Sequence, residues 1–431
     1  MASKFVSKRN LQFLLYEAFD IVELTRHPYF AQHNRKSFDL ILDAGIKDAP
    51  VGVRGISLFI VPRERPDGNG GLAPNDITVT QIYHKMGYRG TPITELSMGE
   101  KNDCRGYLVG TPNNGLAYMF QMMNGSRIGV GAGATAISTA AYYAALGYAS
   151  QRPQGRFTGE KDLSSPQVPI INHADVKRML LFQLAFVEGA HCLLMQCCQY
   201  ADLEKVLTGE AQQRVSLLLD LLTPVAKSYP SETSVISTSM AIQCLGGYGY
   251  CDDFPVEQYF RDTRIHPIHE GTTGIQGMDI LGRKVRMKNG LAFDLFAQTV
   301  KDAIADAQKD ARTAPFADTL KRSIEELKQV TDRLRSRAES DGTAAFLADA
   351  TLYLEYFSLV AIAWQWLRQM TAASRGLLSA PSKADARFYE GKQVTGRYFF
   401  HYELPKTKAL VTRLLDADHL TMEMDPSLFN D

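Results

Sequence analysis

The chain has 431 residues, of which 45% are hydrophobic and 22% are charged, so it is long enough for several domains and at least one large core. Lysine plus arginine and aspartate plus glutamate both number 47, and the formal net charge is therefore zero. This balance excludes the strong overall positive charge that is typical of nucleic-acid-binding chains, and we expect no nucleic-acid partner.

The six cysteines carry no metal-binding pattern, because none forms a CxxC pair with matching histidines. We interpret them as buried free thiols of a reducing compartment, and we expect no metal site. The N-terminal stretch MASKFVSKRNLQFLLYEAFD has no apolar run that ends in a cleavage site. These features predict a cytoplasmic protein.

The first elements along the chain are a short helical opening over 1–43 and then a β-rich region. The runs 56–62 and 76–83 are rich in strand-forming residues, and the turn sequence PDGNGG separates them. The segments 94–98 and 105–110 predict two further strands. Together they indicate a small antiparallel sheet region.

The rest of the chain has helical periodicity. An uncharged stretch over 129–149 is long enough to span a bilayer, but its alanines, glycines and tyrosines favour a buried core helix instead, and we expect no membrane span. The segment ELPKTK is expected to break the pattern before a final short helix. The predicted helices cover 115–150, 173–207, 209–227, 231–245, 255–264, 271–287, 291–312, 315–338, 342–374 and 384–400. The expected fold is mainly α with a small antiparallel β region.

The stretch 242–287 carries the most chemical information. A GGYG sequence at 246–249 can turn sharply or approach a ligand closely, because its glycines lack a Cβ. Arg261 and Asp262 form a charged pair after an aromatic-rich turn. Glu270 lies just before a helix that begins near Thr272. Taken singly, each feature is more often structural: a loop, an ion pair or a helix cap.

The order and spacing of QCLGGYGY, FRDTR and IHEGTTGIQ resemble the C-terminal signature of acyl-CoA dehydrogenases. This resemblance implies that Glu270 is the base that removes the substrate's α-proton, and that the cofactor is FAD. In the family pattern, His269 stands where many members have tyrosine, which alters the surroundings of the base.

Further site residues follow from the same resemblance. Those that match flavin contacts are Arg152 and Gln154 in SQRPQGR, Gln243 and Gly247 in the glycine-rich loop, and Thr272 after the base. Three others match positions near the acyl-CoA thioester: Asn124, Arg127 and Gly271. Gln243 and Gly247 correspond to contacts with the flavin of a neighbouring subunit, so we expect a homo-oligomer, a dimer rather than a tetramer.

The resemblance also divides the chain into four segments. They are a helical remnant over 1–45, a partial middle β-domain over 46–112, a helical bundle with the catalytic loop over 113–290, and an additional helical domain over 291–431. Most of the family's N-terminal helical domain and the first half of its β-domain have no counterpart here, and the chain departs from the family order near 44–46.

The resemblance implies α,β-dehydrogenation of an acyl-CoA thioester, with hydride transfer to the flavin and reoxidation by an electron-transferring flavoprotein. An alternative is a non-catalytic helical binding or assembly protein of the same lineage that has lost flavin binding. In the family, the part of the β-domain that has no counterpart here carries segments that contact the flavin ring. Their absence favours this alternative. The retained Glu270 loop and the Gln243–Gly247 loop argue for the enzyme, because a purely structural protein has no physical need for both.

Overall fold

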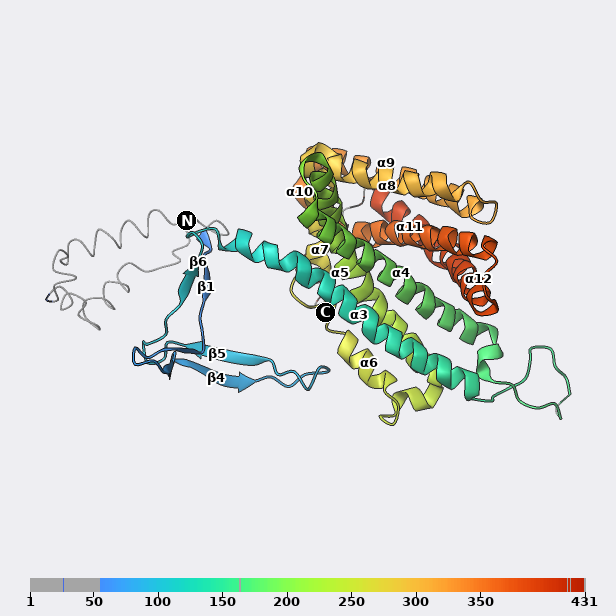
Figure 1. Cartoon of the computed structure of the whole chain (residues 1–431), viewed down its shortest axis with the longest axis horizontal. Coiled ribbons are helices and arrows are strands. Elements are labelled where there is room, and N and C mark those ends of the chain that lie inside the picture. The colour runs from blue at the N-terminus through green and yellow to red at the C-terminus, as the bar shows by residue number, and fades with distance from the viewer. Residues whose placement is uncertain (1–25, 27–54, 163, 417, 419, 430–431) are drawn as a thin grey trace. The chain divides into compact units, whose positions relative to one another are not determined.

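The computed structural model describes residues 26, 55–162, 164–416, 418 and 420–429. The described chain is mainly helical, with short antiparallel strands before its first long helix (Figure 1). This confirms the predicted fold class. Two compact units are present, residues 1–81 with 95–122 and residues 82–94 with 123–431. The predicted helical opening lies outside the described residues except for Arg26, and the predicted division into four segments stays a prediction.

Within the described residues, six strands form three pairs, β1 with β6, β2 with β3 and β4 with β5, and the first two pairs are antiparallel. Each of the four predicted runs contains one strand. The bounds are β1 Leu58–Ile60, β2 Glu64–Pro66, β3 Leu72–Pro74, β4 Ile77–Ile82, β5 Thr94–Met98 and β6 Tyr107–Val109.

The PDGNGG turn closes the short β2–β3 hairpin rather than joining the two longer predicted runs. The Asp67 carboxylate accepts the backbone N–H groups of Asn69 at 2.8 Å and Gly71 at 3.0 Å. Because these bonds complete the turn locally, the residues next to it pair with each other, Glu64 opposite Pro74. β1 therefore pairs with the distant β6, Leu58 opposite Val109.

The helices after residue 114 form a bundle whose core joins α4, α5, α7, α8, α9 and α11 (Figure 1). Trp364 and Trp366 on α11 are among its largest fully buried side chains. The bounds are α3 Gly115–Gln151, α4 Ala174–Val206, α5 Gly209–Leu245, α6 Val256–Thr263, α7 Thr273–Gly282, α8 Leu291–Ala307, α9 Ala314–Ser340, α10 Gly342–Ala348, α11 Ala350–Leu378, α12 Lys383–Tyr398, α13 Thr407–Leu415 and α14 Leu420–Glu423.

α5 is one continuous helix, so the prediction of two helices over 209–227 and 231–245 is wrong. Pro224 and Pro230 lie inside it, and each lacks the N–H that a helix interior normally uses. The stretch around them, 221–228, is entirely buried, so packing on both sides offsets the two lost hydrogen bonds. Tertiary burial therefore overrides the local preference for a break.

Other predicted helix limits also differ, including those of α7, which ends at Gly282, and α8, which ends at Ala307. The run over 342–374 is two helices, α10 and α11, bent by 49° at Asp349. The segment ELPKTK does not break the chain's helical course: a π turn at Phe399–Glu403 and a 3-10 turn at Leu404–Lys406 lead directly into α13. The π turn inserts one residue per turn, which redirects the chain without unwinding it.

α3 packs on α5 at the point where Pro230 leaves a carbonyl without its usual donor. Pro230 has no N–H to offer the carbonyl of Ala226, four residues earlier. Gly131 of α3 lies against that carbonyl so closely that a Cβ there would come within 2.0 Å of the Ala226 oxygen. Glycine is therefore the side chain that this helix crossing requires.

Within the described residues, α4 is long and apolar enough to span a bilayer, and α10 with α11 would pass the same test as one bent span. About two thirds of the most apolar stretch of α4, 67%, is buried among the other helices, as in the core helix of a soluble bundle. The absence of a membrane span stays a prediction.

The six cysteines lie in the described part of the chain and all are free. Cys197 and Cys244 are buried, as expected. Cys198 and Cys251 are exposed, so the expectation of burial is wrong for these two. Cys198 follows Cys197 on the same helix, and adjacent helical residues point about 100° apart, so only one of the two can face the core.

Candidate functional site

The loop that carries Glu270 joins α6 to α7 and is closed by its own backbone. The amide of His269 donates to the carbonyl of Ile265 at 2.9 Å, and the amide of Thr273 donates to the carbonyl of Pro267 at 3.3 Å. α7 begins at Thr273 with Thr272 as its N-cap residue, which confirms the predicted helix start. The side chain of Glu270 is exposed within this closed loop.

Gly271 fixes the turn directly after Glu270. Its φ is +69°, a left-handed conformation that glycine adopts without strain. The buried side-chain amide of Gln276 donates to the Gly271 carbonyl at 3.1 Å. A Cβ at Gly271 would lie 2.4 Å from that amide nitrogen. The conformation and the close contact therefore both require glycine at this position.

The Gly271→Ala variant is expected to lose roughly 1–3 kcal/mol of stability, because alanine is strained at a positive φ and displaces Gln276. The free energy of unfolding, measured by chemical denaturation, checks this. Gly274→Ala is the matched control on the same segment, since no described heavy atom lies within 4 Å of a Cβ there. Equal stabilities for the two variants would contradict the assignment.

A largely apolar cavity of about 680 Å³ lies beside this loop. Its walls come from the hairpin tip between β4 and β5, from α3, and from the segment after α6. Ile268 and His269 line it, and Glu270 follows them directly in the chain. The other lining residues include Met86, Tyr88, Thr91, Ile93, Gly129, Val130, Gly133, Arg264 and His266.

The hairpin tip is held to α6 by specific contacts. The amide of Tyr88 donates to the Asp262 carboxylate at 2.6 Å, and Arg261 donates to the carbonyl of Met86 at 3.0 Å. Arg261 forms its ion pair with Glu257 at 2.7 Å, so Arg261 and Asp262 serve as two separate anchors for the tip. The charged pair in the sequence therefore has a structural role, which is to hold the hairpin tip.

His266 is the most perturbed titratable group among the side chains that line this cavity. It is buried, and burial lowers its pKa to about 4, so the imidazole is neutral at pH 7. One ring nitrogen lies 3.3 Å from the Tyr88 hydroxyl, and the other lies 3.0 Å from the Thr263 carbonyl. In the sequence, nothing marks this histidine beyond its position near the motif.

Stability is expected to fall as the pH is lowered from about 6.5 to 4, because unfolded His266 binds a proton in this window and folded His266 does not. The full loss attributable to the imidazole is roughly 3 kcal/mol. Chemical denaturation of the wild type and of His266→Gln across this range checks it. The pH slope should be steeper in the wild type, and identical slopes would contradict the prediction.

Asn124 and Arg127 on α3 both contact acidic side chains. The amide nitrogen of Asn124 donates to Asp220 on α5 at 3.2 Å. Arg127 is buried and pairs with Asp279 on α7 at 3.2 Å, and in the described part of the chain its Nε has no hydrogen-bond partner. A Cβ at Gly271 would lie 3.9 Å from that Nε, so the Arg127 side chain lies next to the Glu270 loop. Their substrate contacts stay predictions.

Three of the residues that match flavin contacts meet in a second cavity of about 390 Å³. Arg152, Gln154 and Gln243 all line it, with Gly246 at its edge. The Arg152 guanidinium also lies 6.0 Å from the ring centre of Tyr248. No described heavy atom lies within 4 Å of a Cβ at Gly246 or Gly247, so the backbone there is open to a ligand.

The two cavities are separate, because within the described residues they share no lining side chain. Thr272 and Glu270 belong to the loop beside the first, and Arg152, Gln154 and Gln243 belong to the second. The resemblance in the sequence matches Arg152, Gln154 and Thr272 to flavin contacts, and Gln243 to a contact with the flavin of a neighbouring subunit. A single copy of the chain therefore presents them as two surfaces.

The described architecture matches known proteins in two adjacent segments. Residues 113–285 match the family model "Acyl-CoA dehydrogenase, C-terminal domain", and residues 296–425 match "Acetyl-CoA dehydrogenase C-terminal like". Butyryl-CoA dehydrogenase of Syntrophomonas wolfei is 33% identical over 394 residues, which cover 89% of this chain and 63% of that protein. 3-Methylmercaptopropionyl-CoA dehydrogenase of Ruegeria pomeroyi is 34% identical over 373 residues, 86% of this chain and 62% of that protein.

Solved structures agree on the fold. Caenorhabditis elegans ACDH-11, solved in complex with C11-CoA, superposes with a TM-score of 0.66 at 20% identity over 85% of this chain and 58% of that one. An acyl-CoA dehydrogenase of Bacillus anthracis complexed with FAD gives 0.61 at 16% identity over 83% and 60%. This chain spans less than two thirds of the length of each protein named here. The chain belongs to the acyl-CoA dehydrogenase family and carries that family's additional C-terminal helical domain.

Proposed function

We propose that the chain catalyses FAD-dependent α,β-dehydrogenation of an acyl-CoA thioester, with Glu270 as the base that removes the α-proton. The observation that carries this proposal is an exposed carboxylate on a closed loop, next to an apolar cavity of about 680 Å³. Membership of the acyl-CoA dehydrogenase family supports the reaction class.

Under this proposal, Glu270 acts on a substrate atom in that cavity, which its loop neighbours Ile268 and His269 line. A carboxylate removes a carbon-bound proton only where water is excluded and the thioester carbonyl is polarised, so that the two acidities approach each other. Ile268 on the loop and Val130 on α3 supply apolar walls to the cavity. The turn at Gly271, held by Gln276, fixes the direction from which the carboxylate approaches.

The second cavity suits FAD by the chemistry of its donors. Arg152 supplies a guanidinium for a diphosphate, and the side-chain amides of Gln154 and Gln243 can pair with polar edges of a dinucleotide. The open backbone at Gly246 and Gly247 permits close approach of a flat or extended ligand. When bound, FAD supplies the acceptor for the hydride that leaves the β-carbon.

We infer a homo-oligomer from the separation of the two cavities. Glu270 and Thr272 lie on the loop beside the first cavity. The flavin-contact residues Arg152, Gln154 and Gln243 line the second. A cofactor that contacts both sets would be shared between two copies of the chain, and a dimer is the simplest assembly that allows this. An electron-transferring flavoprotein is the partner proposed to reoxidise the cofactor.

The visible absorbance spectrum of the purified chain tests this proposal. Protein mixed with excess FAD and passed through gel filtration should retain a flavin band, and an acyl-CoA should bleach it. Retention of the band without bleaching by acyl-CoAs of short, medium and long chain length would contradict the proposed reaction. Colourless protein would favour the non-catalytic binding or assembly function, as the missing flavin-contact segment of the sequence does.

A further inference from the structure

A buried lysine lies beneath the Glu270 loop. Lys227 on α5 has 0% of its surface exposed, which is rare for lysine. Its ammonium donates to the carbonyl of Pro267, at 3.4 Å, three residues before Glu270 in the same loop. The resemblance to the acyl-CoA dehydrogenase signature in the sequence did not single out this residue.

The same carbonyl closes the loop. The Pro267 oxygen also accepts the amide of Thr273 at 3.3 Å, so this one atom joins the two ends of the segment that contains Glu270. The Thr273 hydroxyl in turn donates to the carboxylate of Glu232, which lies on α5 five residues after Lys227. α5 therefore holds the loop at both ends, by Lys227 at Pro267 and by Glu232 at Thr273.

The charges around Lys227 come from three elements. Burial lowers its pKa to about 8, Glu232 on α5 and Glu270 on the loop oppose this shift, and Arg127 on α3 adds to it. Burial lowers the pKa values of His266 and His269, and the Lys227 charge lowers both further. Since burial outweighs the attraction of both carboxylates, this ammonium is held in the folded chain against its preference for water.

A buried cation usually contributes little to the stability of the fold, because well-packed apolar residues at a buried position stabilise it as well or better. We propose that Lys227 is a positioning residue for the Glu270 loop, tying its closure point at Pro267 to α5 so that the carboxylate keeps one orientation toward the cavity. The link to catalysis rests on the proposed function, but the tie itself is a structural property of the loop.

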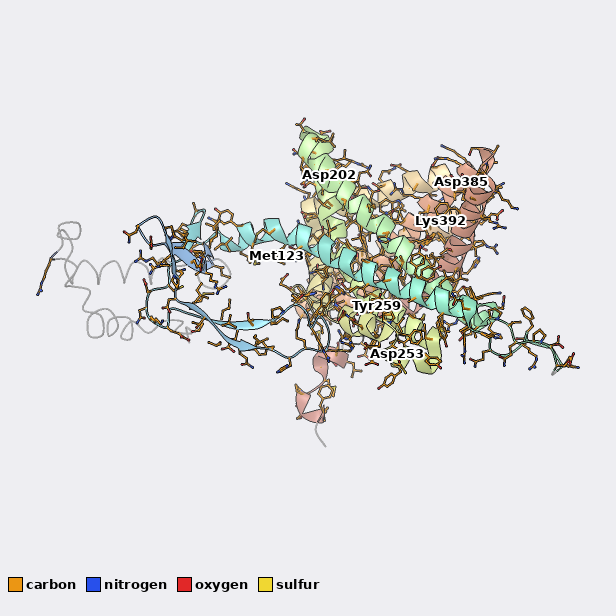
Figure 2. All side chains as sticks on the ribbon, turned by 60° about the horizontal axis from the view of Figure 1, so that its bottom comes forward. Met123, Asp202, Asp253, Tyr259, Asp385 and Lys392 are labelled. Atoms are coloured by element: carbon orange, nitrogen blue, oxygen red, sulfur yellow. The ribbon has the colours of Figure 1, made fainter. Side chains whose placement is uncertain are left out.

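Hydrogen–deuterium exchange tests the tie without any need for activity. In Lys227→Met, amides of the peptide covering 264–273 should exchange at least about tenfold faster, the factor that a lost hydrogen bond to a charged group gives. The matched control is Lys392→Met on α12 (Figure 2), which removes an ammonium paired with Glu188 at 2.7 Å and outside the loop. It should leave exchange in this peptide unchanged.

The Tm of Lys227→Met also distinguishes a role in overall stability from a role in positioning the loop. Methionine has a similar length and no charge to desolvate, so Lys227→Met should keep or raise the Tm at pH 7 while the loop loosens. Lys227→Arg, which keeps a charged donor, should recover part of the exchange protection. Unchanged exchange in a folded Lys227→Met would overturn the proposal, as would a fall in Tm with faster exchange spread evenly over the chain. If the methionine variant does not fold, Lys227→Gln takes its place, and the same two results would overturn the proposal.

Measurements of kcat and KM distinguish this inference from the proposed function. If the wild type bleaches with acyl-CoA, Lys227→Met should lower kcat by up to about 10²-fold with little change in KM, because the base is misplaced while the cavity is kept. An unchanged kcat beside a loosened loop would overturn the positioning role. A wild type that does not bleach would defeat the proposed function alone, and the exchange result would still decide whether Lys227 holds the loop.

Discussion

Replacing Glu270 with glutamine is expected to slow the bleaching of bound flavin by acyl-CoA by ~10²–10⁴-fold, the range that a positioned general base contributes. The glutamine amide has nearly the same shape but cannot accept the α-proton. Because the Glu270 side chain is exposed, the substitution should leave the fold and the flavin content unchanged.

Stopped-flow absorbance at the flavin band measures this rate directly, and the same samples report the flavin content. Asp202→Asn is the control for a change of charge, since Asp202 is an exposed carboxylate on α4 that pairs with Lys205 at 3.3 Å (Figure 2). It should bleach at the wild-type rate. A Glu270→Gln variant that bleaches as fast as the wild type would exclude Glu270 as the base.

Gly131→Ala on α3 is expected to destabilise the protein by ~3 kcal/mol or more. The added Cβ would lie 2.0 Å from the carbonyl oxygen of Ala226 and 3.2 Å from Leu194. Backbone cannot rotate away as a side chain does, so α3 must shift from α5, and overpacking of this kind typically costs 1–3 kcal/mol or more.

The Tm and the free energy of unfolding check the Gly131 prediction against a glycine on the same helix. At Gly147 no described heavy atom lies within 4 Å of a Cβ, and the residue is exposed. Gly147→Ala should therefore raise stability by up to ~1 kcal/mol, because alanine is the better helix former. If both variants shift the Tm in the same direction, the close crossing of α3 and α5 at Ala226 is not the reason for glycine at 131.

Patterns of short range were predictable from the sequence. The strand Thr94–Met98 has the predicted bounds, and α3 and α4 agree with their predicted ranges to within one residue at each end. The start of α7 at Thr273 lies one residue after the predicted start near Thr272. Each of these depends on periodicity, turn residues or caps, which act over a few neighbouring residues.

The family and the Glu270 motif were also accessible from the sequence, because they depend on the order and spacing of residues. The resemblance, rather than any local pattern, identified Arg152, Gln154 and Gln243 as flavin-contact positions, and the second cavity brings these three together. The resemblance assigned Gln243 to the flavin of a neighbouring subunit, but it did not separate Arg152 and Gln154 from the Glu270 loop. That separation depends on how α3, α4 and α5 cross.

Only the tertiary structure decided the features that depend on burial. Pro224 and Pro230 predict a break, yet α5 continues through them because packing on every side holds that stretch in place. The partner of β1 is β6, far along the chain, because the Asp67 turn closes on its nearest neighbours. Lys227 reads as an ordinary lysine in the sequence. Its position beneath the Glu270 loop follows from the crossing of α5 with the α6–α7 connection, a long-range contact that no local pattern encodes.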